Sequence, residues 1–421
     1  MGEAVRRPGG LSRSMEQAEI LTVDAYDFIK PKSISRFLTP VLGEGLIIAE
    51  GSTHRNQRKI LNPAFSVQAL RGLAPIMAKP AWALRRQWLQ AMDSDPSGAP
   101  AVNVSAKLNL VTLDIIGLAA FGEDFCLVED AQSNRLGQAY LDVCLGDKLI
   151  HRVLGVLFPL YRKLPFRAIR IVERGIVSLD EETRAIVLNN LGKTNGDNLL
   201  RRMAREIDPE TGESLSVKEL QAQCLTFMAA GHETAGTALS WCLWFLARHK
   251  DIQTALRTEV RSLSLDDDEV PSYDAINRLN LLNNVCREAL RLIPPVPITY
   301  RVARKDTILG GHVVSKDSFI AVSPLVSHLS PEFWGEDADR FRPSRWDEAP
   351  ANNVSPYVYM PFLAGPRQCI GSKFAMMEMK MVLCIVLKDL LFSEKPNFHP
   401  QKKHVLVTRP SPNMTLVVQR A

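Results

Sequence analysis

The run that contains Cys369 limits the local fold strongly, because it joins residues of very different kinds directly before a long apolar segment: Pro361-Phe362-Leu363-Ala364-Gly365-Pro366-Arg367-Gln368-Cys369-Ile370-Gly371. A helix N-terminus favours a thiolate over a thiol, since its free N–H groups and its positive dipole end stabilise negative charge. Gly365 and Gly371 remove side chains where a flat ligand would approach the backbone, and Arg367 offers a positive fork for a carboxylate. The run therefore predicts a loop and a helix that present Cys369 to a flat, anionic ligand.

These features describe a haem iron that is held by a cysteine thiolate, with Phe362 limiting the access of water. The run also resembles F-x-x-G-x-R-x-C-x-G, the haem-binding signature of the cytochrome P450 monooxygenases, at every defined position. The resemblance implies Cys369 as the metal ligand and Phe362, Arg367 and Gly371 as cofactor-binding residues. The alternative is a buried structural cysteine at a loop–helix junction. Because C-x-x-C-H does not occur, the cofactor would be haem b (iron protoporphyrin IX), bound non-covalently.

A second motif, Ala230-Gly231-His232-Glu233-Thr234-Ala235, falls inside a long predicted helix. Glycine and threonine both weaken a helix interior, and such costs are often accepted at functional positions. We expect Gly231 to let a ligand or dioxygen approach the backbone. The run resembles the oxygen-activation motif [AG]-G-x-[DE]-T of the same family, which implies Glu233 and Thr234 as catalytic residues that deliver protons. The alternative is a solvent-facing Glu–Thr pair on an ordinary helix, and His232 receives no catalytic role.

Glu288 and Arg291 are three residues apart on another predicted helix, so they can form an ion pair. An exposed pair of this kind contributes little. The later segment Asp339-Arg340-Phe341-Arg342-Pro343-Ser344-Arg345-Trp346 strengthens the interpretation, because both runs resemble the E-x-x-R and P-E-R-F-type segments of the family in order. The resemblance implies that Glu288, Arg291 and an arginine of the later segment, predicted here as Arg342, form a structural core behind the haem.

Three further residues are predicted to bind the haem propionates. The run from Gly51 to Arg58 resembles the W-x-x-x-R helix of the family, with His54 in the aromatic position and Arg58 in the arginine position. Arg301 falls where the family often has another propionate arginine. Each arginine alone is more often a surface residue, but with Arg367 they would provide positive charge for two carboxylates.

The apolar periodicity predicts a mainly α-helical chain with small β-sheets, and the resemblance implies the cytochrome P450 fold as a single large domain. Residues 20–421 are assigned to the haem-binding domain, and residues 1–19 to a disordered or irregular segment. We predict helices over 52–61, 216–248 and 281–292, a buried apolar segment over 108–121, and strands over 307–314 and 319–322. A hairpin is predicted around Pro410 to Asn413, between apolar runs at 405–407 and 415–418. The methionines at 376, 377, 379 and 381 are interpreted as core filling rather than a soft-metal site.

Charge and cysteine content narrow the function classes. The net charge of +5 is mild and contains no dense basic block, which excludes nucleic acid as the expected partner. Seven scattered cysteines without C-x-x-C fit a reducing compartment. The resemblance implies a monooxygenase that inserts one atom of O2 into a small apolar organic substrate, as in a biosynthetic tailoring step. Electrons would come from an NADPH-dependent reductase, because no G-x-G-x-x-G motif occurs.

Two alternatives stay open at this stage: a haem-thiolate isomerase, dehydratase or peroxygenase, and a non-catalytic haem-binding member of the family. The substrate is not named by the sequence, whose expected pocket walls fall in 30–48, 140–180 and 296–302.

Residues 1–19 contain no apolar run of the ~20 residues that a membrane-spanning helix needs. The expected location is the endoplasmic reticulum surface if the natural protein carries an anchor, and the cytoplasm otherwise. Residues 149–174 mix apolar side chains with arginines, which allows peripheral membrane contact. The alternative is two core-facing helices that are broken at Pro159 and Pro165.

Overall fold

The computed structural model describes residues 19–421 except 131–133, 145–150, 152–153, 156–157, 159, 162–163, 165, 193–197, 209–210 and 349–354. The predicted segment 1–19 therefore lies almost entirely outside the described residues. The α-helices are α2 (Lys32–Leu42), α3 (Gly51–Leu61), α4 (Val67–Ser94), α5 (Val104–Ile116), α6 (Arg135–Cys144), α8 (Arg167–Gly192), α9 (Leu199–Arg205), α10 (Val217–Arg248), α11 (Lys250–Arg261), α12 (Tyr273–Asn277), α13 (Asn280–Leu292), α14 (Pro324–His328), α15 (Pro331–Trp334) and α17 (Ser372–Leu387). Short 3-10 or π turns are η1 (Glu19–Val23), η2 (Asn62–Phe65), η3 (Gly117–Phe121), η5 (Pro343–Asp347) and η6 (Gly365–Arg367).

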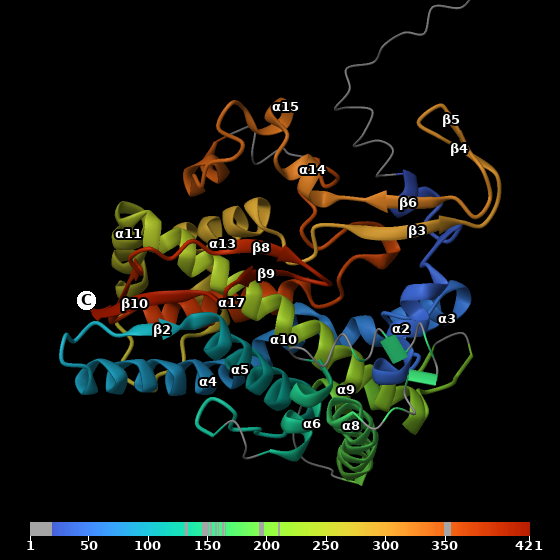
Figure 1. The fold of residues 1–421 in the computed structure, drawn as a ribbon, viewed down its shortest axis with the longest axis horizontal. Helices are drawn as coiled ribbons and strands as arrows, with labels where there is room; N and C mark the ends of the chain where they lie inside the picture. Colours follow the sequence, from blue (N-terminus) through green and yellow to red (C-terminus); the bar gives the residue numbers. More distant parts are fainter. Residues whose placement is uncertain are drawn as a thin grey trace, which may run out of the picture.

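Helix α10 runs through the middle of the molecule, with α4 and α5 along one side (Figure 1). It begins with a capping box, in which the Ser216 side chain accepts from the Glu219 backbone and the Glu219 side chain accepts from Ser216. Its bounds confirm the predicted helix over 216–248. The close approach of α10 to α5 depends on Gly231, since a Cβ there would lie 2.7 Å from Cδ1 of Ile116.

That contact gives Gly231 a packing role that the motif did not predict. The missing side chain of Gly231 makes room for Ile116 of α5. The apolar segment over 108–121 is buried as predicted, in α5 and η3. By length and composition the stretch 104–121 is also the one part of the described chain that would suit a membrane span, but 72% of that window is buried inside the fold.

Helix α17 packs against α4 and α10, with Met377, Met379 and Met381 almost fully buried. Met376 is partly buried against the same core. These positions confirm the methionines as core residues. Among the described residues no group of three or more His, Cys, Asp or Glu side chains is placed to hold a metal ion.

The strands form small antiparallel sheets in the orders β1-β3-β6, β2-β10-β7, β4-β5 and β8-β9. Their bounds are β1 (Phe28–Ile29), β2 (Ala101–Asn103), β3 (Thr299–Ala303), β4 (Thr307–Leu309), β5 (His312–Val314), β6 (Phe319–Val322), β7 (Leu390–Glu394), β8 (Gln401–His404), β9 (Thr408–Ser411) and β10 (Thr415–Arg420). The predicted hairpin around residues 410–413 is wrong, because β9 pairs with β8 whereas β10 pairs with β2 and β7. The observed hairpin turns at residues 405–407 instead.

Candidate active site

Cys369 lies between η6 and α17, in a loop that closes on itself through a hydrogen bond of 2.8 Å from the Cys369 N–H to the Phe362 carbonyl. The Cys369 side chain is accessible. The surrounding protein nevertheless raises the pKa of its thiol by desolvation, while the backbone of Gly371 and the charge of Arg58 act to lower it. A thiol that is accessible and yet enclosed by protein suits a ligand that approaches from one side only.

The two glycines of this loop have different roles. A Cβ on Gly371 would meet nothing closer than Cε1 of Phe65 at 4.0 Å, so the backbone there is open to a neighbour. Gly365 has φ +71°, and a Cβ there would lie 1.9 Å from the carbonyl oxygen of Leu21. The expectation that Gly365 makes room for a ligand is therefore corrected: it makes room for the N-terminal part of the chain.

Four basic side chains gather beside this loop, and we call them the cation cluster: Lys30, Arg58, Arg301 and Arg367. Lys30 and Arg367 both pair with the carboxylate of Glu50. Arg301, on β3, is only 4% exposed and donates at 2.8 Å to Oγ1 of Thr299 and to the Tyr300 carbonyl. Within the described part of the chain neither Arg58 nor Arg301 forms an ion pair, and Nη1 of buried Arg367 has no hydrogen-bond partner.

The cation cluster is electrostatically incomplete. Desolvation, with further lowering by Arg367, brings the pKa of Arg301 to about 10. Desolvation, together with Arg367 and Arg301, brings the pKa of Lys30 to about 8, although Glu50 acts in the opposite direction. Buried charges are normally paired, so this excess of positive charge fits a ligand that brings carboxylates of its own. The two propionates of a haem meet that requirement.

His54, on α3, is 3% exposed and belongs to the same region. Its Nδ1 is 3.0 Å from the hydroxyl oxygen of Tyr26. Desolvation and the charges of Lys30, Arg367 and Arg58 lower the pKa of His54 to about 4, so the ring is neutral at physiological pH. Tyr26, Lys30 and Glu50 could not be predicted from the sequence, because they precede the first recognised motif and reach the site only through the fold.

The predicted catalytic pair lies on α10, but its two side chains have separate partners. Oγ1 of Thr234 donates to the Ala230 carbonyl at 2.6 Å. Glu233 is 12% exposed at its side chain and pairs with Arg409 of β9. The neighbouring His232 is fully buried, and its Nδ1 is 3.2 Å from the Tyr140 hydroxyl of α6, which places it in the core. Arg409 was not found by sequence analysis, since no motif contains it.

The third motif forms what we call the glutamate-centred cluster, which comprises Glu288, Arg291, Arg345 and Trp346. Glu288 and Arg291 pair within α13 at 2.8 Å, and both side chains are 0% exposed. Arg345 donates from Nε to Oε1 of Glu288 at 2.9 Å, and Trp346 donates from Nε1 to Oε2 at 3.0 Å.

The prediction of Arg342 as the third member is wrong. The side chain of Arg342 pairs with Asp337 and Glu348 and is 37% exposed, and only its backbone N–H reaches Glu288. Arg345 is the buried arginine because the 3-10 turn of η5 directs it, and not Arg342, toward α13.

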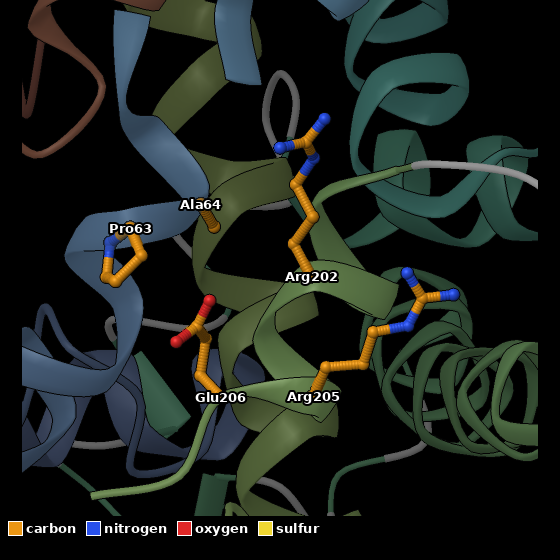
Figure 2. A pocket seen from close by; sticks show the side chains of 5 residues that line it. All are labelled: Pro63, Ala64, Arg202, Arg205 and Glu206. Atoms are coloured by element: carbon orange, nitrogen blue, oxygen red, sulfur yellow. The ribbon is translucent and has the colours of Figure 1, made fainter. Parts of the chain in front are cut away.

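A separate pocket of about 320 Å³ lies between η2 and α9. Figure 2 shows the side chains that line it. Its lining comprises Pro63, Ala64, Arg202, Arg205 and Glu206. None of the residues predicted for the active site contributes to this cavity.

Comparison with known proteins gives a likeness along nearly the whole chain. The family model for cytochrome P450 matches residues 15–417. Cytochrome P450 monooxygenase sphH of Aspergillus fumigatus is 36% identical over 402 residues, which cover 90% of this chain and 72% of the relative. Cytochrome P450 monooxygenase 205 of Postia placenta is 34% identical, over 97% of this chain and 83% of the relative. The crystal structure of the cytochrome P450DA heme domain aligns with a TM-score of 0.84 at 27% identity, over 97% of this chain and 86% of that one.

Proposed function

The chain belongs to the cytochrome P450 family and is a monooxygenase of that family, and on this premise we propose that Cys369 is the axial ligand of its haem iron. The family and the matching heme domain imply a haem-thiolate cofactor. When bound, the haem supplies the activation of O2 and the insertion of one oxygen atom into an organic substrate. The observation that supports the assignment is the accessible, enclosed thiol of Cys369 beside a cation cluster with unmatched charge.

In this proposal the surrounding side chains hold the cofactor in one orientation. Arg58, Arg301 and Arg367 would bind its carboxylates by charge, and neutral His54 would donate a hydrogen bond. Gly371 leaves the backbone beside Cys369 uncovered, and Phe362 limits water near the sulfur. The glutamate-centred cluster would keep the loop and α13 in register behind the site.

The test is the difference spectrum of the reduced, carbon monoxide-treated protein. We expect the wild-type protein to show the haem-thiolate Soret shift and Cys369→Ser to lose it. Cys126→Ser is the matched control, because Cys126 is also a partly accessible loop cysteine and should leave the spectrum unchanged. A Soret shift that survives in Cys369→Ser would refute the assignment.

Proton delivery is proposed to run through Glu233 and Thr234. Arg409 holds the Glu233 carboxylate in place through an ion pair. The hydroxyl of Thr234 donates a hydrogen bond to the Ala230 carbonyl, so the lone pairs of its oxygen can accept a hydrogen bond from another group. We expect Thr234→Ala to raise the peroxide released per NADPH consumed. Ser240→Ala is the control, since Ser240 makes the same bond to the carbonyl four residues earlier in α10. Equal peroxide release in the two variants would remove Thr234 from the path.

The reaction also needs an electron donor and a substrate. Monooxygenases of this family take electrons from a reductase and use O2. For this chain we propose an NADPH-dependent reductase and a small apolar substrate in a biosynthetic tailoring step. Spectral shifts on binding, measured across a panel of lipophilic compounds, would identify the substrate class, and product formation with NADPH and the reductase would verify it.

A location at the endoplasmic reticulum surface is also a proposal. It is supported by a group of exposed apolar side chains in the stretch before α8: Phe158, Leu160, Leu164 and Phe166. Parts of the predicted basic stretch 149–174 lie outside the described residues. Flotation with phosphatidylcholine vesicles should recover the wild-type protein but less of a variant with Phe158→Ser and Leu160→Ser, and equal recovery would count against membrane contact.

A further inference from the structure

The N-terminal stretch from Glu19 to Lys30 touches the motifs on both sides of the cation cluster. The Leu21 carbonyl lies where a side chain at Gly365 would be. The Ala25 carbonyl accepts from Nε of Arg367 at 3.4 Å. The backbone N–H of Lys30 donates to Oε1 of Glu50 at 3.0 Å. The chain between these anchors is therefore held against the Cys369 loop and against the start of α3.

Tyr26 lies between the anchors, and its ring contacts three residues of the site. It meets the ring of His54 edge-on, with centroids 5.8 Å apart and an angle of 61° between the planes. The guanidinium of Arg55 lies 4.1 Å from the centroid of the Tyr26 ring, and that of Arg367 lies 5.1 Å from it. Cations at this distance from an aromatic face are attracted to it. The ring thus orders two arginines as well as the histidine.

The direction of the hydrogen bond between Tyr26 and His54 depends on which nitrogen of the imidazole carries the proton. A neutral imidazole carries one donor nitrogen and one acceptor nitrogen. Two guanidiniums beside Tyr26 weaken its oxygen as an acceptor and strengthen its O–H as a donor, since positive charge stabilises electron density on the oxygen. When Tyr26 donates, Nδ1 of His54 accepts and the ring proton is on Nε2. Nε2 has no hydrogen-bond partner among the described residues.

We propose that Tyr26 is a positioning residue for the haem carboxylates, because it holds His54 in the tautomer whose Nε2–H can donate to them. This inference rests on the proposed function. The arginines of the cation cluster attract a carboxylate from any direction, whereas His54 adds a donor with one orientation. Without the Tyr26 hydroxyl the ring proton could move to Nδ1. Nε2 would then present its lone pair to a carboxylate, and the two would repel each other.

The experiment measures the rate at which haem leaves the holoprotein for an excess of apomyoglobin. Tyr26→Phe keeps the ring and its cation contacts but removes the hydroxyl. We expect it to lose haem about tenfold faster than the wild type, the usual size of effect for a residue that orients a ligand-binding group. Tyr140→Phe is the matched control, because Tyr140 makes an equivalent bond to His232 in the core and should change the rate by less than about twofold.

Two further arms separate positioning from packing. In a His54→Leu background, Tyr26→Phe should have no further effect, since its only route to the haem is removed. With the dimethyl ester of haem, whose carbonyl oxygens are neutral and weaker acceptors, the difference in release rate between wild type and Tyr26→Phe should be clearly smaller than with haem.

An unchanged rate in Tyr26→Phe, additive effects with His54→Leu, or the same acceleration with the ester would each overturn the inference. A wild-type protein that binds no haem would overturn the proposed function itself, and with it the inference.

Discussion

Two groups of buried arginines in this molecule are completed in different ways. In the glutamate-centred cluster, Arg291 donates to both oxygens of Glu288 and to the carbonyls of His328, Ala338 and Arg340. In the cation cluster, Arg367 has one nitrogen without a partner and Arg301 has no ion pair within the described residues. The first group is satisfied by the chain alone, and the second is not.

The difference separates structural arginines from ligand-binding ones. A buried guanidinium needs partners for its N–H groups and an opposite charge nearby. Where the fold supplies all of them, the residue contributes to a rigid core. Where the fold buries the cation and leaves its charge unmatched, an anionic ligand can form the missing ion pair, and the free energy of that pair stabilises the bound ligand. The two groups should therefore respond to mutation in opposite directions.

The largest effect is expected from Glu288→Gln, which removes the negative charge at the centre of the glutamate-centred cluster and keeps the shape of the side chain. Arg291, whose side chain is 0% exposed, would lose its carboxylate, and Arg345, at 3% exposure, would keep only its ion pair with Asp337. Breaking a buried pair in this way costs about 3–5 kcal/mol. Urea unfolding of the protein with and without haem should show the loss in both forms. A loss that is confined to the haem-bound form would contradict the structural role.

The opposite sign is expected for Arg301→Gln. Burial and the charge of Arg367 lower the pKa of Arg301 to about 10, so the charged form is disfavoured in the haem-free protein. Removing that charge should stabilise the haem-free protein by about 1–3 kcal/mol, a range that allows for relaxation of the protein around the charge. The same variant should release haem at least about tenfold faster. Urea unfolding and haem transfer give the two values, and destabilisation of the haem-free form would place Arg301 with the structural arginines.

The features that could be predicted from the sequence are those that neighbouring residues encode. The helix over 217–248 was found almost to the residue because Ser216 and Glu219 form its capping box and its interior is apolar. The hairpin at 410–413 was wrong because β10 pairs with strands that lie far away in the sequence, at 101–103 and 390–394. Short apolar runs do not encode such pairings.

The site shows the same limit. The motif around Cys369 and the predicted ion pair of Glu288 and Arg291 could be read from residue spacing. The choice between Arg342 and Arg345 could not, since the two lie three residues apart and only the packing of η5 on α13 decides which side chain is buried. Tyr26 was missed because its bond to His54 spans 28 residues of sequence and belongs to no motif.

A smaller effect, with a dependence on pH, is expected from Lys30. Desolvation, Arg367 and Arg301 lower the pKa of Lys30 from 10.5 to about 8 in the folded, haem-free protein. Below pH 8 both the folded and the unfolded chain carry the proton, and the folded state bears the full cost of the charge. Between pH 8 and 10.5 the folded state loses the proton first, so that cost declines as the pH rises.

The stability of the wild-type protein relative to Lys30→Met should therefore rise by about 1–2 kcal/mol between pH 8 and pH 9.5. Urea unfolding of the haem-free forms at several pH values measures this difference, and the comparison with Lys30→Met cancels the titration of other groups. A difference that stays constant, or that falls with pH, would mean that Lys30 is not held as a surplus cation.

The smallest effect is expected from Arg342→Gln, which tests whether the Arg342 side chain lies outside the glutamate-centred cluster. The Arg342 side chain is 37% exposed and pairs with Asp337 and Glu348, which are themselves partly exposed. Such pairs contribute about 0.2–1 kcal/mol, and the backbone N–H that reaches Glu288 is retained in the variant. Arg345→Gln, by contrast, should cost several kcal/mol, because it removes a buried partner of Glu288. The two arginines lie three residues apart in the same turn-forming segment, so thermal unfolding of the two variants compares burial directly. If Arg342→Gln proved as damaging as Arg345→Gln, membership of the motif, and not satisfaction of the buried charge, would define the structural arginines.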